Sequence, residues 1–397
     1  MSKISSFAER SDISVNYITV LNDRVHEMLN GGEDVVCFHS GEVGYSTPQH
    51  IKDAAYDWLN EGYMHYAPTT GYRELKTAIA VKLAARNGIE ADPDTEILVT
   101  QGAAEAIYAT LMAILNPGDE FLMMDPCYPS YESCVKMAEG VPQLIPTIEE
   151  NEWKAGYAEI EERVTDRTRG IIVNSPNNPT GEMLDKADLD DLCEIAHQHD
   201  IWVVSDEAYE EIVFDGRRHY SIGSFPDMKD RTISIFTFSK TFAMTGWRLG
   251  YIVGPKKFIE HANVIHQAVL EHVTSHVQMA GCTALRGPQS SSDMVADLNR
   301  RRKQLVEGLN RIHEINCKMP KGAFYAFADI KELGVTSAQF SQRLLSEAKV
   351  SVTPGTAFGR CGEGYVRLAY SQSSNEHITK GLERMTNLIA ASAPAVC

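Results

Sequence analysis

One lysine and one arginine stand at a fixed spacing in the segment Ser239-Lys-Thr-Phe-Ala-Met-Thr-Gly-Trp-Arg248. The preceding run, residues 232–239, alternates and is rich in β-branched and aromatic residues, so it predicts a strand that delivers Lys240 at its carboxyl end. Desolvation there and a nearby guanidinium both lower the pKa of a lysine, which makes it a nucleophile able to form a Schiff base. We therefore expect Lys240 to act through a covalent bond.

Groups that could hold a phosphate surround this lysine. Arg248 offers a guanidinium fork, and the hydroxyls of Thr237 and Ser239 offer further donors. An imine-forming lysine beside a phosphate site indicates pyridoxal 5′-phosphate, whose protein partners usually include an acid facing the pyridine nitrogen. Asp206 supplies that acid, because it follows the short apolar run 201–205.

The turn at Gly102 provides a second group of phosphate donors. Here the chain passes from a predicted strand into a helix of strong helix formers. The free N–H groups of Ala103 and Ala104, together with the helix dipole, favour a bound dianion. Arg248 begins its own predicted strand, residues 248–254, so it can join this site only if that strand runs antiparallel to the others.

Three ordered motifs carry a resemblance to a known family. They are Asn174-Ser-Pro-Asn-Asn-Pro-Thr-Gly181, Ser205-Asp-Glu-Ala-Tyr209 and the lysine segment 239–248. Together they resemble the signatures of class I/II aminotransferases, the aspartate aminotransferase-like enzymes of fold type I, and the likeness runs nearly from end to end. The resemblance implies a homodimer with shared active sites that transfers an amino group between an L-amino acid and a 2-oxo acid.

The resemblance also implies roles for residues around the cofactor. Asn178 and Tyr209 would donate to its phenolic oxygen and so tune the acidity of the imine. Tyr128, in a loop with two prolines, would stack on the pyridine ring, although packing of the turn is an alternative role. Tyr66, in a loop that resembles Tyr-x-Pro-x-x-Gly, would reach the cofactor phosphate of the other subunit.

Arg367 stands in the middle of the apolar run 364–370, where a charged side chain needs a partner. In the family that the motifs resemble, this arginine grips the α-carboxylate of the substrate with two parallel hydrogen bonds. The resemblance places Gly41 and Asn178 at the same carboxylate. We therefore expect Arg367 to bind substrate rather than an internal carboxylate.

The order of apolar runs predicts the fold class. Between residues 96 and 254, compact apolar runs are separated by helical or loop segments, which is typical of α/β proteins. Their continuous apolar character predicts strands covered on both faces, hence a mostly parallel sheet with one antiparallel strand. The expected strands are 96–100, 120–125, 170–174, 201–205, 232–239 and 248–254.

A smaller α+β domain is expected at the carboxyl end, with strands at 322–329 and 364–370. We expect residues 1–45 to join that small domain, residues 46–288 to form the large cofactor-binding domain, and residues 289–397 to complete the small one. Residues 255–290 predict one long helix that carries four histidines. Their spacing does not sustain one helical face, so we expect no metal site there.

Composition limits the possible partners and compartment. The chain has 397 residues, 43% of them hydrophobic, and a formal charge of −17, which disfavours nucleic acid and anionic membranes as partners. Its amino terminus lacks the apolar core of a signal peptide, and its eight cysteines are scattered, so we expect a cytoplasmic protein with reduced thiols.

Two other functions stay open at this level. A lyase or cyclase of the same fold would need the same cofactor residues, and the segments 43–46 and 270–275 depart from the family pattern, which leaves substrate choice open. Within the second segment, Glu271 and His272 are candidate substrate-selecting residues. Many dicarboxylate-specific bacterial relatives in the family have lysine where Ala104 stands, so the alanine removes one of the usual supports for aspartate specificity.

A cofactor-sensing regulator is the other alternative. It would need an added DNA-binding segment, for which we expect no room.

Overall fold

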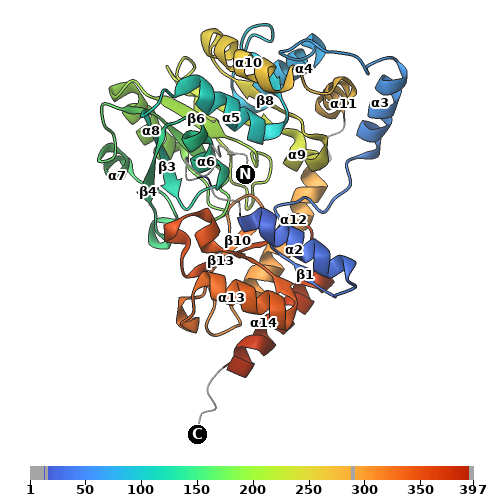
Figure 1. Ribbon diagram of the computed structural model, residues 1–397, viewed down its shortest axis with the longest axis vertical. Coiled ribbons are helices and arrows are strands. Elements are labelled where there is room, and N and C mark those ends of the chain that lie inside the picture. The colour runs from blue at the N-terminus through green and yellow to red at the C-terminus, as the bar shows by residue number, and fades with distance from the viewer. Residues whose placement is uncertain (1–12, 14–16, 288–290, 393–397) are drawn as a thin grey trace, which may run out of the picture.

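The computed structural model describes residue 13 and residues 17–287 and 291–392, which contain a sheet of seven strands, one of four and one of two. Figure 1 shows the seven-stranded sheet and its helices in the upper half of the molecule and the four-stranded sheet in the lower half. We call these the large unit and the small unit. The apolar core is divided among several clusters that follow this arrangement.

The seven-stranded sheet has the order β2-β8-β7-β6-β5-β3-β4. Its strand β8 runs antiparallel to both neighbours, and the other neighbouring pairs are parallel. This arrangement confirms the predicted α/β fold with one antiparallel strand. The strands are β2 (Ile97–Thr100), β3 (Glu120–Asp125), β4 (Val141–Pro146), β5 (Thr168–Asn174), β6 (Trp202–Asp206), β7 (Thr232–Thr237) and β8 (Gly250–Val253).

Helices cover both faces of this sheet, and successive strand residues alternate between the two covers. In β5, Ile172 packs with the cluster that includes α5 and α6, whereas Ile171 and Val173 pack with the cluster that includes α8. The continuous apolar runs of the sequence are therefore explained by burial on both sides. The helices of the large unit are α3 (Gln49–Asn60), α4 (Arg73–Lys82), α5 (Gly102–Ile114), α6 (Ser130–Met137), α7 (Tyr157–Glu161), α8 (Lys186–Gln198), α9 (Phe238–Thr241), α10 (Lys256–Leu270) and α11 (Ser275–Arg286).

Strand β4 is absent from the sequence-based prediction. It contains Pro142 and Pro146, and it pairs only with β3 at the edge of the sheet. Proline lacks the N–H that an inner strand must donate, so a strand that carries two of them is tolerated at an edge and is hard to recognise from its sequence.

The single long helix predicted for residues 255–290 is wrong, because the structure divides this stretch into α10 and α11, which Figure 1 draws as separate helices. The chain leaves the helical conformation at Glu271, whose φ is 61°. Among the helices of the described ranges, none combines the length and the apolar character needed to cross a membrane.

The small unit is built around the sheet β12-β13-β10-β9. The amino-terminal strand β1 pairs in parallel with β11, so the start of the described chain lies against its carboxyl-terminal part. The elements are α2 (Tyr17–Asn30), β1 (Val36–Cys37), α12 (Ser291–Leu309), β9 (Asn316–Cys317), β10 (Tyr325–Asp329), α13 (Ser337–Arg343), β11 (Val350–Ser351), β12 (Thr353–Pro354), β13 (Tyr365–Ala369) and α14 (Asn375–Ser392).

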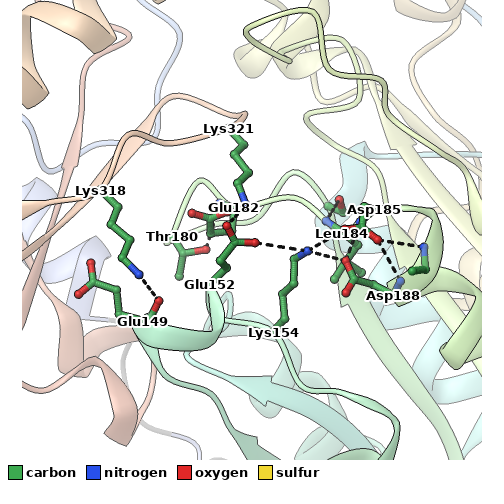
Figure 2. A network of polar contacts seen from close by, with 12 residues as sticks. Glu149, Glu152, Lys154, Thr180, Glu182, Leu184, Asp185, Asp188, Lys318 and Lys321 are labelled. Atoms are coloured by element: carbon green, nitrogen blue, oxygen red, sulfur yellow. Dashed lines mark hydrogen bonds and ion pairs between the residues drawn. The ribbon is translucent and has the colours of Figure 1, made fainter.

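A network of charged side chains joins the two units where β10 approaches the loop after β5 (Figure 2). The ammonium of Lys321 lies 2.8 Å from Glu182 Oε2 and 2.6 Å from Glu152 Oε1. The backbone N–H groups of Lys321 and Gly322 both donate to the carbonyl of Gly181, at 2.8 and 2.9 Å. The loop of the Asn174–Gly181 motif is thus fixed to the chain that leads into β10.

Candidate active site

A cavity of about 390 Å³ lies between the carboxyl ends of β5, β6 and β7 and the four-stranded sheet. Ligands of open α/β sheets bind at this end of the strands. Most of the side chains singled out in the sequence meet here. Those that line the cavity are Gly41, Ala103, Ala104, Tyr128, Asn178, Asp206, Tyr209, Thr237, Ser239, Lys240, Arg248 and Arg367.

Lys240 lies in the short helix α9, just after β7 ends at Thr237, so the strand is two residues shorter than predicted. Its Nζ donates to the carbonyl oxygen of Gly41 over 2.8 Å. Burial, helped by the positive charges of Arg248 and Arg367, lowers the pKa of Lys240 to about 8. A substantial fraction of this amine is therefore neutral near physiological pH.

Asp206 is the last residue of β6 and its carboxylate is held by two donors. Tyr131 donates from its hydroxyl to Oδ2 over 2.6 Å, and the N–H of Ala208 donates to Oδ1 over 3.1 Å. Burial raises the pKa of Asp206, while the bonds from Tyr131 and Ala208 act in the opposite direction. Among the described residues, no lysine, arginine or histidine nitrogen lies within ion-pair distance of it.

The corner of the cavity beside α5 contains Gly102 and Arg248. A Cβ on Gly102 would lie 2.6 Å from Arg248 Nη2, so only glycine allows this guanidinium to approach the start of the helix. Arg248 itself precedes β8, which begins at Gly250, and the antiparallel direction of β8 brings it to this end of the sheet. Thr237 and Ser239 line the same cavity as Arg248, and their hydroxyl oxygens lie 2.9 Å apart.

Arg367 is 2% exposed and has no acidic partner among the described residues. Its Nη1 donates to Asn178 Oδ1 over 2.9 Å, and its Nη2 donates to the carbonyl oxygen of His39 over 2.6 Å. Nε is buried without a hydrogen-bond partner. A guanidinium that is buried against neutral oxygens lacks the countercharge that such a site requires.

Two tyrosines from different units meet at the cavity. The hydroxyl oxygens of Tyr209, which follows β6, and Tyr325, which begins β10, lie 2.7 Å apart. A Cβ on Gly41 would lie 2.5 Å from the Tyr325 hydroxyl, so a side chain at position 41 would displace it. Gly41, Tyr325 and Lys240 therefore form one connected wall of the cavity.

Tyr66, Glu271 and His272 lie outside the cavity. Tyr66 is 84% exposed, and its ring meets the edge of the His272 ring at a centroid distance of 5.4 Å. Glu271 directly follows α10. A single copy of the chain thus leaves these three residues together at the surface.

The structure adds residues that the sequence reasoning did not select. Tyr131 contacts Asp206 directly, and Asn174 donates from Nδ2 to the Asp206 carbonyl over 2.9 Å while its Oδ1 accepts from the N–H of Asn178. Glu42 lines the cavity next to Gly41 and accepts a bond from the hydroxyl of Thr245. Asn174 begins the motif 174–181 and Tyr131 follows Tyr128 by three residues, so their places beside predicted site residues were the available signal.

One group of three possible metal ligands occurs in the described ranges, formed by Glu207, Glu210 and His219. The ammonium of Lys82 is bonded to Glu210, and His219 Nε2 lies 2.8 Å from Glu207 Oε2. These nitrogen atoms already supply partners for the carboxylates. The group lies apart from the four histidines of α10, α11 and the residues between them.

Comparison with known proteins places this geometry in a family. A family model described as "Aminotransferase class I and II" matches residues 33–385. The chain belongs to the class I and II aminotransferases. It is 42% identical to an aspartate aminotransferase of Pyrococcus abyssi over 92% of this chain and 94% of the relative, and 40% identical to the aromatic-amino-acid aminotransferase 2 of Thermococcus litoralis with the same coverage.

Solved structures agree with the assignment of this aminotransferase. The aromatic aminotransferase of Pyrococcus horikoshii has a TM-score of 0.88 and 42% identity, and covers 92% of this chain and 99% of its own. The aspartate aminotransferase of Rhizobium meliloti has a TM-score of 0.93 and 33% identity, with coverages of 98% and 99%. The predicted family and activity are therefore confirmed, and the chain transfers amino groups between amino acids and 2-oxo acids.

Proposed function

We propose that this aminotransferase works with pyridoxal 5′-phosphate attached at Nζ of Lys240. The family generally depends on this cofactor. In the proposal, Arg248, the hydroxyls of Thr237 and Ser239, and the free N–H groups at the start of α5 hold its phosphate. Asp206 faces the pyridine nitrogen, Asn178 and Tyr209 face the phenolic oxygen, and Tyr128 covers the ring.

The chemistry of the donor set supports this fit. The carboxylate of Asp206 is buried and has only neutral donors, so a protonated pyridine nitrogen would supply the positive charge that it lacks. The close contact of Gly102 with Arg248 leaves donors and positive charge together at a helix start, which suits a phosphate dianion. Lys240, with its pKa lowered to about 8, can provide a neutral amine.

One observation carries the proposal furthest, namely that Lys240 and an arginine without a countercharge line the same cavity. Arg367 would bind the α-carboxylate of the substrate, whose oxygens can satisfy the guanidinium as a fork. The cofactor, when bound, supplies an electron sink for the bond that breaks at the α-carbon. Nζ of Lys240 would take the α-proton and return it, and Asp206 would keep its partner nitrogen protonated.

The test of cofactor attachment is spectral. The purified enzyme should be yellow, and borohydride should remove the visible band and leave a phosphopyridoxyl label on Lys240. A label on another lysine would refute the assignment. With an amino donor and no oxo acid, the bound cofactor should stop in its pyridoxamine form. Continuous product formation from one amino acid would favour the lyase alternative.

For the substrate, we propose an amino acid with an aromatic or other uncharged side chain. Among the described lining residues, the cations are Lys240, Arg248 and Arg367, and each already has a role in the proposal. The rest of the wall includes Ala104 and the carboxylate of Glu42, which would repel a second carboxylate. The aromatic aminotransferases of Thermococcus litoralis and Pyrococcus horikoshii, at 40% and 42% identity, support this choice.

Turnover of phenylalanine and aspartate tests the substrate proposal. We expect kcat/KM to be at least about tenfold higher for phenylalanine, which corresponds to about 1.4 kcal/mol. Glu42→Gln should reduce the difference by improving aspartate. A wild-type preference for aspartate would show that a cation from outside the described lining residues serves its side chain.

We propose a homodimer in which Tyr66 of one copy serves the phosphate site of the other. Exposed apolar side chains in α3 and in the segment that follows it support this, since Tyr56 is 68% exposed and Met64 is 59% exposed. Mixing Tyr66→Phe and Lys240→Ala proteins tests the sharing. If the sites are shared, hybrid dimers contain one site with both changes and one site with neither, and so regain activity.

We also propose that the large cofactor-binding domain spans residues 46–288, with residues 1–45 and 289–397 forming the small domain. The pairing of β1 with β11 supports the placement of the amino-terminal segment.

We propose a cytoplasmic location as well. The cysteines of the described residues form no disulfide bonds, as is typical of proteins in reducing compartments. Limited proteolysis and cell fractionation test these two points.

A further inference from the structure

Tyr325 is a cavity residue to which the proposed function gives no role. It is 1% exposed, and its hydroxyl lies 2.7 Å from that of Tyr209, which is 6% exposed. Neither hydroxyl has another hydrogen bond among the described residues. The two tyrosines are 116 positions apart, with Tyr209 in the loop after β6 of the large unit and Tyr325 in β10 of the small unit, so their contact joins the two units.

The pair leaves one proton unused. Each phenol has one O–H, and a single hydrogen bond between the two oxygens employs only one of them. Burial raises the pKa of both tyrosines, so both stay protonated near neutral pH. Whichever tyrosine accepts within the pair therefore has its own proton available for a third atom in the cavity.

We propose that Tyr325 is a positioning residue that donates to Tyr209 and thereby directs the Tyr209 proton toward the phenolic oxygen of the cofactor. This inference rests on the proposed function. A hydroxyl that accepts a hydrogen bond becomes a stronger donor, because successive bonds polarise one another. The wall around the pair keeps the Tyr325 hydroxyl in place, since Gly41 leaves room for it and the Arg367 guanidinium lies 4.5 Å from the centre of its ring.

The proposal predicts a shift in the colour change of the bound cofactor with pH. A donor at the phenolic oxygen favours the form in which that oxygen is negatively charged and Nζ of Lys240, which joins the cofactor to the protein, has lost its proton. Weakening the donor disfavours that form, so the midpoint of the absorbance titration should rise. We expect Tyr325→Phe to raise it by about 0.5 to 1 pH unit, the size that one hydrogen bond supports.

Four variants make the experiment specific. Tyr209→Phe should raise the midpoint more than Tyr325→Phe, and the double variant should equal Tyr209→Phe alone, because Tyr325 acts through Tyr209. Gly41→Ala should raise it too, since the new Cβ would displace the Tyr325 hydroxyl. Tyr370→Phe is the matched control, because Tyr370 is 0% exposed in the same core cluster and its hydroxyl donates to the Ala323 carbonyl at 3.4 Å.

The outcomes separate this inference from the proposed function. An unchanged midpoint in Tyr325→Phe, or additive shifts in the double variant, would overturn the role of Tyr325 while the cofactor assignment stands. A wild-type enzyme with no visible band on Lys240 would overturn both. The melting temperatures of the cofactor-free Tyr325→Phe and Tyr370→Phe proteins should fall equally. Of these two variants, only Tyr325→Phe should shift the midpoint of the absorbance titration. Only Tyr325→Phe should also lower kcat more than it changes KM.

Discussion

The hydroxyl of Tyr131 donates to Oδ2 of Asp206 over 2.6 Å, which links the first turn of α6 to the last residue of β6. Tyr128 lies three residues earlier, in the loop before α6, and the two rings meet edge to face at 5.5 Å. One short segment, the end of this loop and the first turn of α6, thus positions both the ring proposed to cover the cofactor and the donor that opposes the effect of burial on Asp206.

Tyr131→Phe should reduce kcat about tenfold or more, because a hydrogen bond to a charged group contributes about 1.5–3 kcal/mol. Without this donor the pKa of Asp206 rises further. Since the proposed role requires the ionised carboxylate, the acid limb of the kcat profile should move to higher pH. Measurements of kcat across the pH range locate the acid limb. Tyr157→Phe is the control, because it loses an exposed hydrogen bond to Gln198. An unmoved acid limb would contradict the role.

Asp206→Asn should lower kcat by on the order of 10²-fold, about 2.7 kcal/mol of barrier. It should also stabilise the cofactor-free protein at neutral pH. The pKa of Asp206 in the folded protein is raised above its pKa in the unfolded chain. Ionisation of this carboxyl therefore lowers the free energy of unfolding. The loss develops as the pH rises from the unfolded pKa through the folded pKa. Urea unfolding at acid and neutral pH tests the sign. A variant that is less stable than wild type only at neutral pH would contradict it.

Lys240 should react with small aldehydes at lower pH than a lysine of ordinary pKa. Its pKa is lowered to about 8, and the neutral amine is the reactive form, so labelling should rise through that pH and level off above it. Reductive methylation of the cofactor-free protein, read by mass spectrometry, measures the midpoint. Lys186, whose side chain is 62% exposed, is labelled in the same samples as an exposed reference. A Lys240 midpoint near the ordinary lysine value of about 10.4 would refute the assignment of Lys240 as the activated amine.

The sequence predicts the parts of this site that stand at strand ends. Lys240 and Asp206 each follow an apolar run, and the rule that parallel strands present ligands at their carboxyl ends brings both to one edge. The antiparallel direction of β8 could be inferred as well, because Arg248 precedes its strand. These deductions need only local patterns and one topological rule.

Contacts between distant segments escape such reasoning. Tyr325 lies in a strand whose sequence is typical of an apolar core, and nothing local indicates that its hydroxyl meets that of Tyr209 in the large unit. The break at Glu271 is equally hidden, since its positive φ arises where the chain turns between α10 and α11. Both features depend on tertiary packing, which the periodicity of the sequence does not reveal.

Arg367→Lys should raise KM for the amino acid by about 30-fold, or about 2 kcal/mol, because an ammonium cannot form the two parallel bonds of a guanidinium. Arg302→Lys is the matched control. Arg302 is 1% exposed and binds both oxygens of Asp215, at 2.7 and 2.9 Å, outside the cavity. It should lose stability and keep its KM. An Arg367→Lys enzyme with wild-type KM would remove this arginine from substrate binding.

Lys321→Met should destabilise the cofactor-free protein by about 3 kcal/mol, since it leaves the carboxylate of Glu182 buried without its cation. The side chains of Lys321 and Glu182 are 15% and 8% exposed, and Figure 2 shows the lysine placed between Glu182 and Glu152. Urea unfolding measures the loss. Lys186→Met, which breaks an exposed pair with Asp190, should cost under about 0.5 kcal/mol.

The dependence of this loss on pH gives the sharper test. Burial raises the pKa of Glu182 and Lys321 opposes that rise, so removing Lys321 should raise the pKa further. The carboxyl then becomes neutral at low pH, where it no longer needs a cation. The loss in Lys321→Met should therefore be small at about pH 5 and large at about pH 8. Adding Glu182→Gln should recover most of the stability at the higher pH. An equal loss at both pH values, with no recovery in the double variant, would show that Lys321 stabilises the junction through packing instead of charge.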